Sequence, residues 1–228
     1  MNAWELLGET RTPDGSDMSL TARAGEFVIR VSGKTLMSSR QHGSEEVLAE
    51  AACKGLRTSP EARVLVGGLG MGFTVRATLD LLAPGATVTV AELVPAVVDW
   101  NRGPLGPLAD HPLADDRTKV RVEDVSITLR EHVNHFNAIL LDVDNGPTAF
   151  TTDANNALYE NDGVAAAHAA LKHDGTLAVW SAWDDRKFEH RLRFHGFDLE
   201  VVTARSRSKK GGAHHVIFVG RKSPTSGR

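Results

Sequence analysis

The chain has 228 residues, of which 41% are hydrophobic and 24% are charged, and its formal net charge is −3. These values suit one globular domain, and the small negative charge gives no general attraction to nucleic acid. No apolar run approaches the ~20 residues of a membrane-spanning helix, and no signal peptide is visible. The single cysteine, Cys53, excludes an intrachain disulfide and is interpreted as a small buried apolar residue. We therefore expect a cytoplasmic protein.

The N-terminal part of the chain, residues 1–42, is rich in β-forming segments and turn residues. Alternating or β-branched runs cover residues 19–23, 27–31 and 35–37, and they predict a small antiparallel β-lobe. Ser44 stands directly before two glutamates, so we expect it to cap a helix that runs to about Leu56.

From residue 63 onward, short apolar strands alternate with helical patterns. Predicted strands cover residues 64–66, 87–91, 119–122, 138–141 and 176–181, and residues 199–203 and 215–219 are expected to close the sheet as an antiparallel pair. This alternation predicts an α/β domain over residues 43–222, with a mostly parallel sheet covered on both faces. Residues 205–212 are interpreted as a mobile basic loop and residues 223–228 as a disordered tail.

The main functional signal is the glycine-rich turn Gly68-x-Gly70-x-Gly72, between a predicted strand and a predicted helix. Glycine lets backbone N–H groups approach a ligand, and ligands of open α/β sheets bind at the carboxyl ends of strands. Glu92 ends the second strand and can accept hydrogen bonds from ribose hydroxyls. Asp124 follows the third strand and can accept one from an adenine amino group. The alternatives are an ordinary turn and solvated strand-end acids.

Both a dinucleotide and an adenosyl-sulfonium compound fit these features, and the G-x-G-x-G spacing favours the second. The motifs also occur in a distinctive order: the β-lobe, Ser44-Glu45-Glu46-x-x-x-Glu50, residues 67–72, Val90-Ala91-Glu92-Leu93, Val122-Glu123-Asp124-Val125 and residues 136–142. Over about residues 25–220, this order resembles the spermidine synthase (polyamine aminopropyltransferase) family, a branch of the class I S-adenosylmethionine-dependent methyltransferase superfamily.

The resemblance implies a fold, a donor site and an oligomeric state. The implied fold is Rossmann-like, with a mostly parallel seven-stranded sheet, an antiparallel C-terminal strand pair and a small N-terminal β-lobe. The implied oligomer is a homodimer. The residues implied to hold the donor, S-adenosylmethionine or its decarboxylated form, are Gly68, Gly70, Gly72, Glu92, Leu93, Asp124, Val125 and Asp142.

Several positions depart from the family pattern. The family carries an aspartate inside its glycine turn, in a pattern like G-G-G-D-G, and we assign that place to Gly70. Its loop D-x-x-D-P corresponds to Asp142-Val143-Asp144-Asn145-Gly146-Pro147, and its acceptor-side tyrosine to Leu48. Because a buried ammonium needs an acid, a turn without the aspartate favours intact S-adenosylmethionine. Its carboxylate suits the free N–H groups of a helix N-terminus.

Three side chains are candidates for the chemistry. Asp142 and Asp144 follow the fourth strand and would point the same way in an extended loop, where they can bind an amine or take its proton. His42 precedes the first helix and is a possible base near neutral pH. The alternatives are a backbone cap for Asp142, a plain turn at Asp144 and a surface histidine at position 42. No Cys/His set has metal-ligand spacing, so no metal is expected.

We therefore expect a methyltransferase that uses S-adenosylmethionine and acts on a small amine. A divergent aminopropyltransferase is the alternative, and a non-catalytic nucleotide-binding partner protein is the third hypothesis. Neither nucleic acid nor a membrane is expected as a partner.

Overall fold

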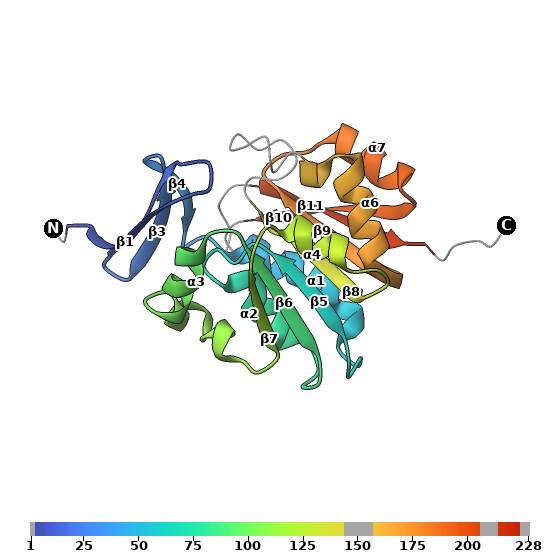
Figure 1. Ribbon diagram of the computed structural model, residues 1–228, viewed down its shortest axis with the longest axis horizontal. Coiled ribbons are helices and arrows are strands. Elements are labelled where there is room, and N and C mark those ends of the chain that lie inside the picture. The colour runs from blue at the N-terminus through green and yellow to red at the C-terminus, as the bar shows by residue number, and fades with distance from the viewer. Residues whose placement is uncertain (1–2, 144–156, 206–213, 224–228) are drawn as a thin grey trace.

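The computed structural model describes residues 3–143, 157–205 and 214–223 of the chain. It contains an antiparallel four-stranded sheet near the N-terminus and a seven-stranded sheet flanked by helices (Figure 1). The predicted tail, apart from Ser223, and residues 206–212 of the predicted basic loop lie outside the described residues, as does Asp144.

The N-terminal sheet has the strand order β1-β2-β3-β4, and every neighbouring pair is antiparallel. Its strands are β1 (Glu5–Arg11), β2 (Asp17–Arg23), β3 (Glu26–Val31) and β4 (Lys34–Ser38). The predicted strand segments lie within β2, β3 and β4, whereas β1 was not predicted. A Cβ atom added to Gly8 in β1 would lie 2.4 Å from the indole nitrogen of Trp100, so a glycine is needed where this sheet packs on the main domain.

The larger sheet has the order β10-β11-β9-β8-β5-β6-β7. Its strands are β5 (Arg63–Gly67), β6 (Thr87–Glu92), β7 (Thr118–Val122), β8 (Phe136–Leu141), β9 (Leu171–Ser181), β10 (Phe197–Arg205) and β11 (His214–Lys222). The first five are parallel to one another, and β11 is antiparallel to both β9 and β10. The predicted fold class is therefore confirmed.

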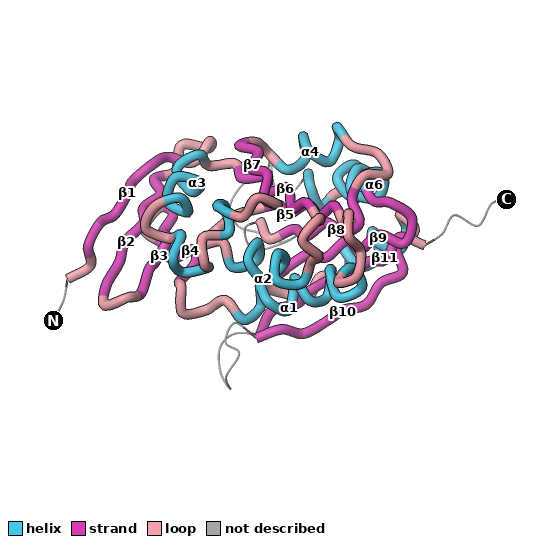
Figure 2. Tube along the Cα trace, turned by 90° about the horizontal axis from the view of Figure 1, so that it is seen from below, coloured by secondary structure: helices cyan, strands magenta, loops and turns pink. Residues whose placement is uncertain are grey.

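Alternate residues of the central strands face two separate cores. Val64 and Val66 of β5 belong to one core, and Leu65 between them belongs to the other. Such alternation is the period of a β-strand covered on both faces. The helices are α1 (Gly43–Cys53), α2 (Phe73–Leu81), α3 (Pro95–Arg102), α4 (Val125–Glu131), α6 (Asn161–Ala170) and α7 (Arg186–Phe194). The first three contribute to one core and the last three to the other. Figure 2 shows α1 and α2 side by side.

The start of α1 differs from the sequence prediction. The helix begins at Gly43, with His42 at the N-cap position, and no side chain caps it. The Ser44 hydroxyl instead donates a hydrogen bond to the carboxylate of Glu45 at 2.7 Å. Ser44 already lies inside the first turn, so its hydroxyl is not placed to cap the helix. Cys53 at the end of α1 is fully buried, and burial raises the pKa of its thiol to about 12, as suits an unreactive core residue.

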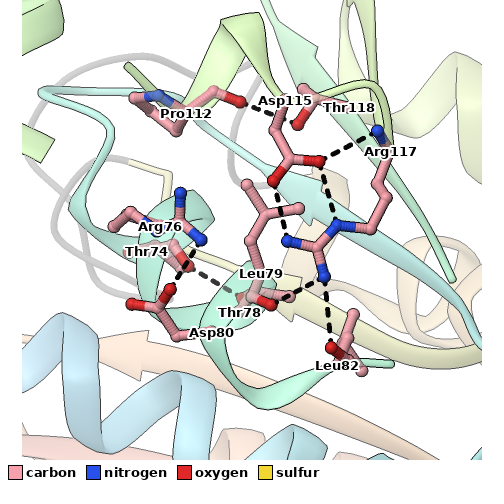
Figure 3. A network of polar contacts seen from close by, with 10 residues as sticks. All are labelled: Thr74, Arg76, Thr78, Leu79, Asp80, Leu82, Pro112, Asp115, Arg117 and Thr118. Atoms are coloured by element: carbon pink, nitrogen blue, oxygen red, sulfur yellow. Dashed lines mark hydrogen bonds and ion pairs between the residues drawn. The ribbon is translucent and has the colours of Figure 1, made fainter. Parts of the chain in front are cut away.

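An ion pair anchors the end of α2 to the start of β7 (Figure 3). Arg117 binds the Asp115 carboxylate at 2.7 Å, and its guanidinium also donates to the carbonyl oxygens of Leu79 and Leu82 at 2.9 and 3.1 Å. The last carbonyls of a helix have no partner within the helix. Arg117 therefore satisfies two of them and fixes α2, whose other end begins directly after the glycine turn.

Among the described residues, no helix is long and apolar enough to span a membrane. These residues also contain no group of three or more His, Cys, Asp or Glu side chains placed to hold a metal ion.

Candidate functional site

The candidate site lies at the carboxyl ends of four neighbouring parallel strands, β8, β5, β6 and β7. The chain continues from β5 to β6 on one side, whereas β8 lies on the other side and leads on to β9. The strand order thus reverses between β5 and β8, and in open α/β sheets ligands bind at such a switch point. The glycine turn follows β5, and Glu92, Asp124 and Asp142 end or follow the other three strands.

All three glycines of the turn have positive φ angles: +88° at Gly68, +52° at Gly70 and +85° at Gly72. Residues with a side chain adopt this region only under strain. The surroundings are equally restrictive, because a Cβ at Gly68 would lie 2.3 Å from the carbonyl oxygen of Asp142. Tight packing inside the protein thus explains the glycines at least in part. It also brings the turn into direct contact with the end of β8.

Glu92 is held by the backbone of the glycine turn. One carboxylate oxygen accepts a hydrogen bond from the N–H of Leu69 at 2.9 Å, and the other accepts one from Val94 at 2.8 Å. The side chain is buried, and burial raises its pKa although these N–H groups act in the opposite direction. A carboxylate oxygen has room for a second hydrogen bond. Glu92 is therefore oriented in advance beside the turn.

Asp124 caps helix α4. Its Oδ1 accepts a hydrogen bond from the N–H of Ser126 at 2.7 Å, and no described residue binds its Oδ2. Val125 next to it is buried, and its Cγ2 would lie 2.8 Å from a Cβ at Gly67. Leu93, on the neighbouring strand end, remains 41% exposed. Leu93 and Asp124 thus follow the ends of two neighbouring strands, β6 and β7.

Asp142 is held by contacts on several sides. Its N–H donates to the carbonyl of Gly67 at 2.9 Å, and its Oδ2 accepts a hydrogen bond from the buried hydroxyl of Thr74 at 2.5 Å. Burial raises the pKa of its carboxyl group, and the Thr74 hydroxyl counteracts this. Asp144 lies outside the described residues, so the expected Asp142/Asp144 pair stays a prediction.

The structure brings a different acid toward Asp142, namely Glu45 in the first turn of α1. Burial, and after it the negative charge of Asp142, raise the pKa of Glu45 to about 7. No described Lys or Arg side chain forms an ion pair with either acid. Two carboxylates without a cation suit a positively charged ligand. Sequence reasoning missed Glu45 as a site residue, although it belongs to the segment at 44–50 that carries part of the resemblance.

His42 lies beside the turn but faces another partner. Its Nδ1 is 3.1 Å from a carboxylate oxygen of Glu46, and its ring stacks on Phe73 at 4.3 Å between centroids. Phe73 is the first residue of α2 and directly follows Gly72. The assignment of His42 as a base stays a prediction, and the contact with Glu46 offers a structural role for it.

The position that carries an acid in the family is apolar here. A Cβ at Gly70 would lie 2.9 Å from the methyl carbon of Met37, so a residue of β4 reaches over the turn. The assignment of that position to Gly70 stays a prediction, and Met71 is the residue that follows it. Met71 is buried, and neither position offers a carboxylate.

The residues present fit an adenosyl-sulfonium ligand in part. The turn, Glu92, Leu93 and Asp124 lie in order along one edge of the sheet, as a nucleoside requires. Negative charge for a cationic group comes from Glu45 and Asp142 rather than from the turn itself.

His215, on β11, packs against Trp180 at 4.6 Å between ring centroids, which agrees with a packing role for both.

Solved structures of other proteins share this architecture. A spermidine synthase in complex with the transition-state analogue AdoDATO has a TM-score of 0.73 at 17% identity, with 96% of this chain and 72% of that chain covered. Spermidine synthase from Thermotoga maritima has a TM-score of 0.74 at 16% identity, with the same coverage. A probable spermidine synthase from Corynebacterium glutamicum has a TM-score of 0.69 at 17% identity and covers 98% of this chain and 81% of its own.

No protein-family model matches the chain, and no curated protein sequence is significantly similar to it. At these identities the structural match establishes architecture rather than activity. The match extends from the N-terminal sheet to the C-terminal strand pair, because nearly the whole chain is covered. The chain therefore has the fold of the spermidine synthases.

Proposed function

We propose that this protein transfers an alkyl group from an adenosyl-sulfonium donor to a small amine. The observation that carries the proposal is the arrangement at the sheet edge: Glu92 lies on one side of the glycine turn, and Asp142 lies on the other. The first suits the polar ribose of a nucleoside, and the second suits a cation. The likeness to spermidine synthase structures supports the same assignment.

The donor would be held by residues of four strand ends. Glu92 would accept hydrogen bonds from the ribose, Asp124 Oδ2 from the adenine amino group, and Leu93 and Val125 would contact the ring. Gly68, Gly70 and Gly72 would let the turn approach the donor closely. Asp142, shared between the donor and the acceptor, would lie next to the reacting groups.

The donor supplies a carbon bonded to cationic sulfur; attack by an amine nitrogen breaks the C–S bond, leaves its electron pair on sulfur and frees one amine proton. Asp142 and Glu45 would attract the protonated amine, and after one carboxylate has taken a proton from it, the neutral nitrogen would attack that carbon in line with the C–S bond. With a pKa of about 7, Glu45 can also accept a proton near neutral pH. Asp144 would add a third acid if it faces the same space.

Aminopropyl transfer from decarboxylated S-adenosylmethionine now leads within this class. Its cationic tail lacks a carboxylate, and Glu45 and Asp142 supply the opposite charge. Methyl transfer from intact S-adenosylmethionine is the second candidate. It is favoured by Gly70, because the turn lacks the acid that the family pattern contains there.

The decisive experiment offers both donors with a panel of small amines, including putrescine, and identifies the product by mass spectrometry. Methylthioadenosine from the decarboxylated donor would establish aminopropyl transfer, and S-adenosylhomocysteine from the intact donor would establish methyl transfer. If calorimetry detected donor binding but neither product formed with any amine, a non-catalytic binding protein would be the better description.

The donor site is tested by replacing Asp124 with serine. Serine keeps the helix cap but removes the second oxygen. We expect the dissociation constant of the donor to rise about tenfold, which corresponds to one lost hydrogen bond. Glu131→Gln, on the exposed end of the same helix, is the control and should leave donor binding unchanged. Unaltered binding to Asp124→Ser would exclude this residue from the donor site.

We also propose that the protein forms a homodimer and that it is located in the cytoplasm. Light scattering of the purified chain tests the first, and fractionation of the cells that produce it tests the second.

A further inference from the structure

A buried tyrosine connects the end of β8 with helix α7. Tyr159 is the only tyrosine in the sequence, and its side chain is 2% exposed. Its phenol donates a hydrogen bond to the carbonyl oxygen of Val143 at 3.2 Å. Val143 directly follows Asp142, so this hydrogen bond restrains the backbone where the candidate acid leaves the sheet.

The glycine turn holds the same peptide from the other side. The Asp142 N–H donates to the Gly67 carbonyl at 2.9 Å, and the Asp142 carbonyl oxygen lies against Gly68. Thr74 binds the carboxylate itself. None of these contacts involves the Val143 carbonyl. Tyr159, which belongs to the core to which α6 and α7 contribute, binds that carbonyl.

Tyr159 is itself held in place by α7. A guanidinium nitrogen of Arg191 donates to the Tyr159 carbonyl oxygen at 2.6 Å, and another pairs with Glu160 at 2.8 Å. The tyrosine ring packs edge-to-face against Phe188, with 5.7 Å between centroids. A helix buried against the sheet therefore fixes both the backbone and the ring of Tyr159.

We propose that Tyr159 is a positioning residue, which keeps the Asp142 carboxylate beside the glycine turn by holding the Val143 carbonyl. The proposal rests on the proposed function, because the placement of Asp142 matters for alkyl transfer only if that reaction occurs. Reaction rates are sensitive to such placement, since a displacement of 1 Å can cost roughly 100-fold.

The kinetic test is Tyr159→Phe, which keeps the ring and removes the hydroxyl. We expect kcat to fall about 10- to 100-fold while the donor dissociation constant stays within about threefold, because every proposed donor contact except Asp142 lies at the end of another strand. Thr118→Val is the matched control. It removes a hydroxyl that donates to the Pro112 carbonyl at 2.8 Å, at the end of β7 far from Asp124, and it should leave kcat within about twofold.

A structural test does not depend on activity. In Tyr159→Phe, amide hydrogen exchange over residues 138–143 should be about tenfold faster than in the unmodified protein, and exchange over β7 should be unchanged. Unchanged exchange over 138–143 would overturn the proposal, and so would a kcat within twofold of the unmodified enzyme. If the unmodified protein transferred no alkyl group, the proposed function would fail, and hydrogen exchange alone would decide whether Tyr159 holds the end of β8.

Discussion

Two regions of this molecule contain carboxylates that the fold holds in place: Asp115 beside Arg117, and Glu45 with Asp142. They differ in whether a cationic side chain of the protein neutralises the carboxylate charge. Asp115 binds Arg117 through both of its oxygens, at 2.7 and 2.9 Å, and these contacts lower its pKa to about 2 (Figure 3). Burial raises the pKa of both Glu45 and Asp142, the charge of Asp142 raises the pKa of Glu45 further, and no described Lys or Arg side chain pairs with either acid. The first region is complete within the fold, whereas the second favours a cation from outside.

This difference separates stabilising acids from acids of the candidate site. A carboxylate satisfied by an internal arginine contributes to folding at neutral pH. Carboxylates without such a partner cost stability when they ionise, and a bound amine would remove that cost. The two regions should therefore respond in opposite ways to mutation, pH and ligand.

The largest expected effect is on activity, from Asp142→Asn. Removal of this charge should lower kcat for alkyl transfer at least about 100-fold, because the amine loses both its counter-charge and its orientation. The measurement is product formation followed by mass spectrometry. Asp115→Asn is the control from the other region and should leave kcat per folded molecule unchanged. Comparable activity losses in the two variants would abolish the distinction between the regions.

The second effect is on stability, from Arg117→Ala. The change leaves the Asp115 side chain without its ion-pair partner and removes the guanidinium donor from the Leu79 and Leu82 carbonyls, so the free energy of unfolding at pH 7 should fall by about 2 kcal/mol. Because Asp115 has a folded pKa of about 2, below its ordinary value of 3.8, its contribution is present above pH 4 and is lost toward pH 2. Urea unfolding at both pH values measures this. A loss that does not shrink in acid would contradict the assigned role.

Glu45→Gln should reveal the opposite pH dependence. The folded pKa of Glu45, about 7, lies above its ordinary value of 4.5, so between these values the folded chain binds more protons than the unfolded chain. Stability from this group is therefore present below pH 4.5 and declines as pH rises to 7. The variant should be more stable than the unmodified protein at pH 8 by on the order of 1–2 kcal/mol, with little difference at pH 4.5. If urea unfolding found the variant no more stable than the unmodified protein at pH 8, the raised pKa of Glu45 would be contradicted.

The smallest expected effect is the number of protons released when an amine binds. At pH 6.5, binding of putrescine beside Glu45 and Asp142 should release up to about one proton, because a cation favours the ionised carboxylate. Calorimetry in two buffers with different ionisation enthalpies measures this number. The release should decline above pH 8 and should be reduced in Glu45→Gln. Putrescine binding without proton release at pH 6.5 would place the cation elsewhere.

Local patterns were sufficient for most of the main domain. Short apolar runs predicted β5 and β8, and the strand ends placed Glu92, Asp124 and Asp142 at one edge of the sheet, because carboxyl ends of parallel strands meet there. Strand β1 was missed because its seven residues are largely exposed and lack an apolar alternation. Its place in the sheet depends on pairing with β2 and on the contact between Gly8 and Trp100, neither of which a local pattern contains.

By itself, the sequence determined the α/β order, the strand-end acids and the glycine turn, since each follows from a period or spacing within about ten residues. Only the tertiary structure decided which distant residues influence one another: the charge of Asp142 acts on Glu45, Met37 packs over Gly70, and Tyr159 binds the Val143 carbonyl. These contacts join segments on different elements, and their geometry follows from how helices pack on the sheet. The charge of the candidate site is therefore a property of the packed molecule, because it depends on which acids and cations are brought together.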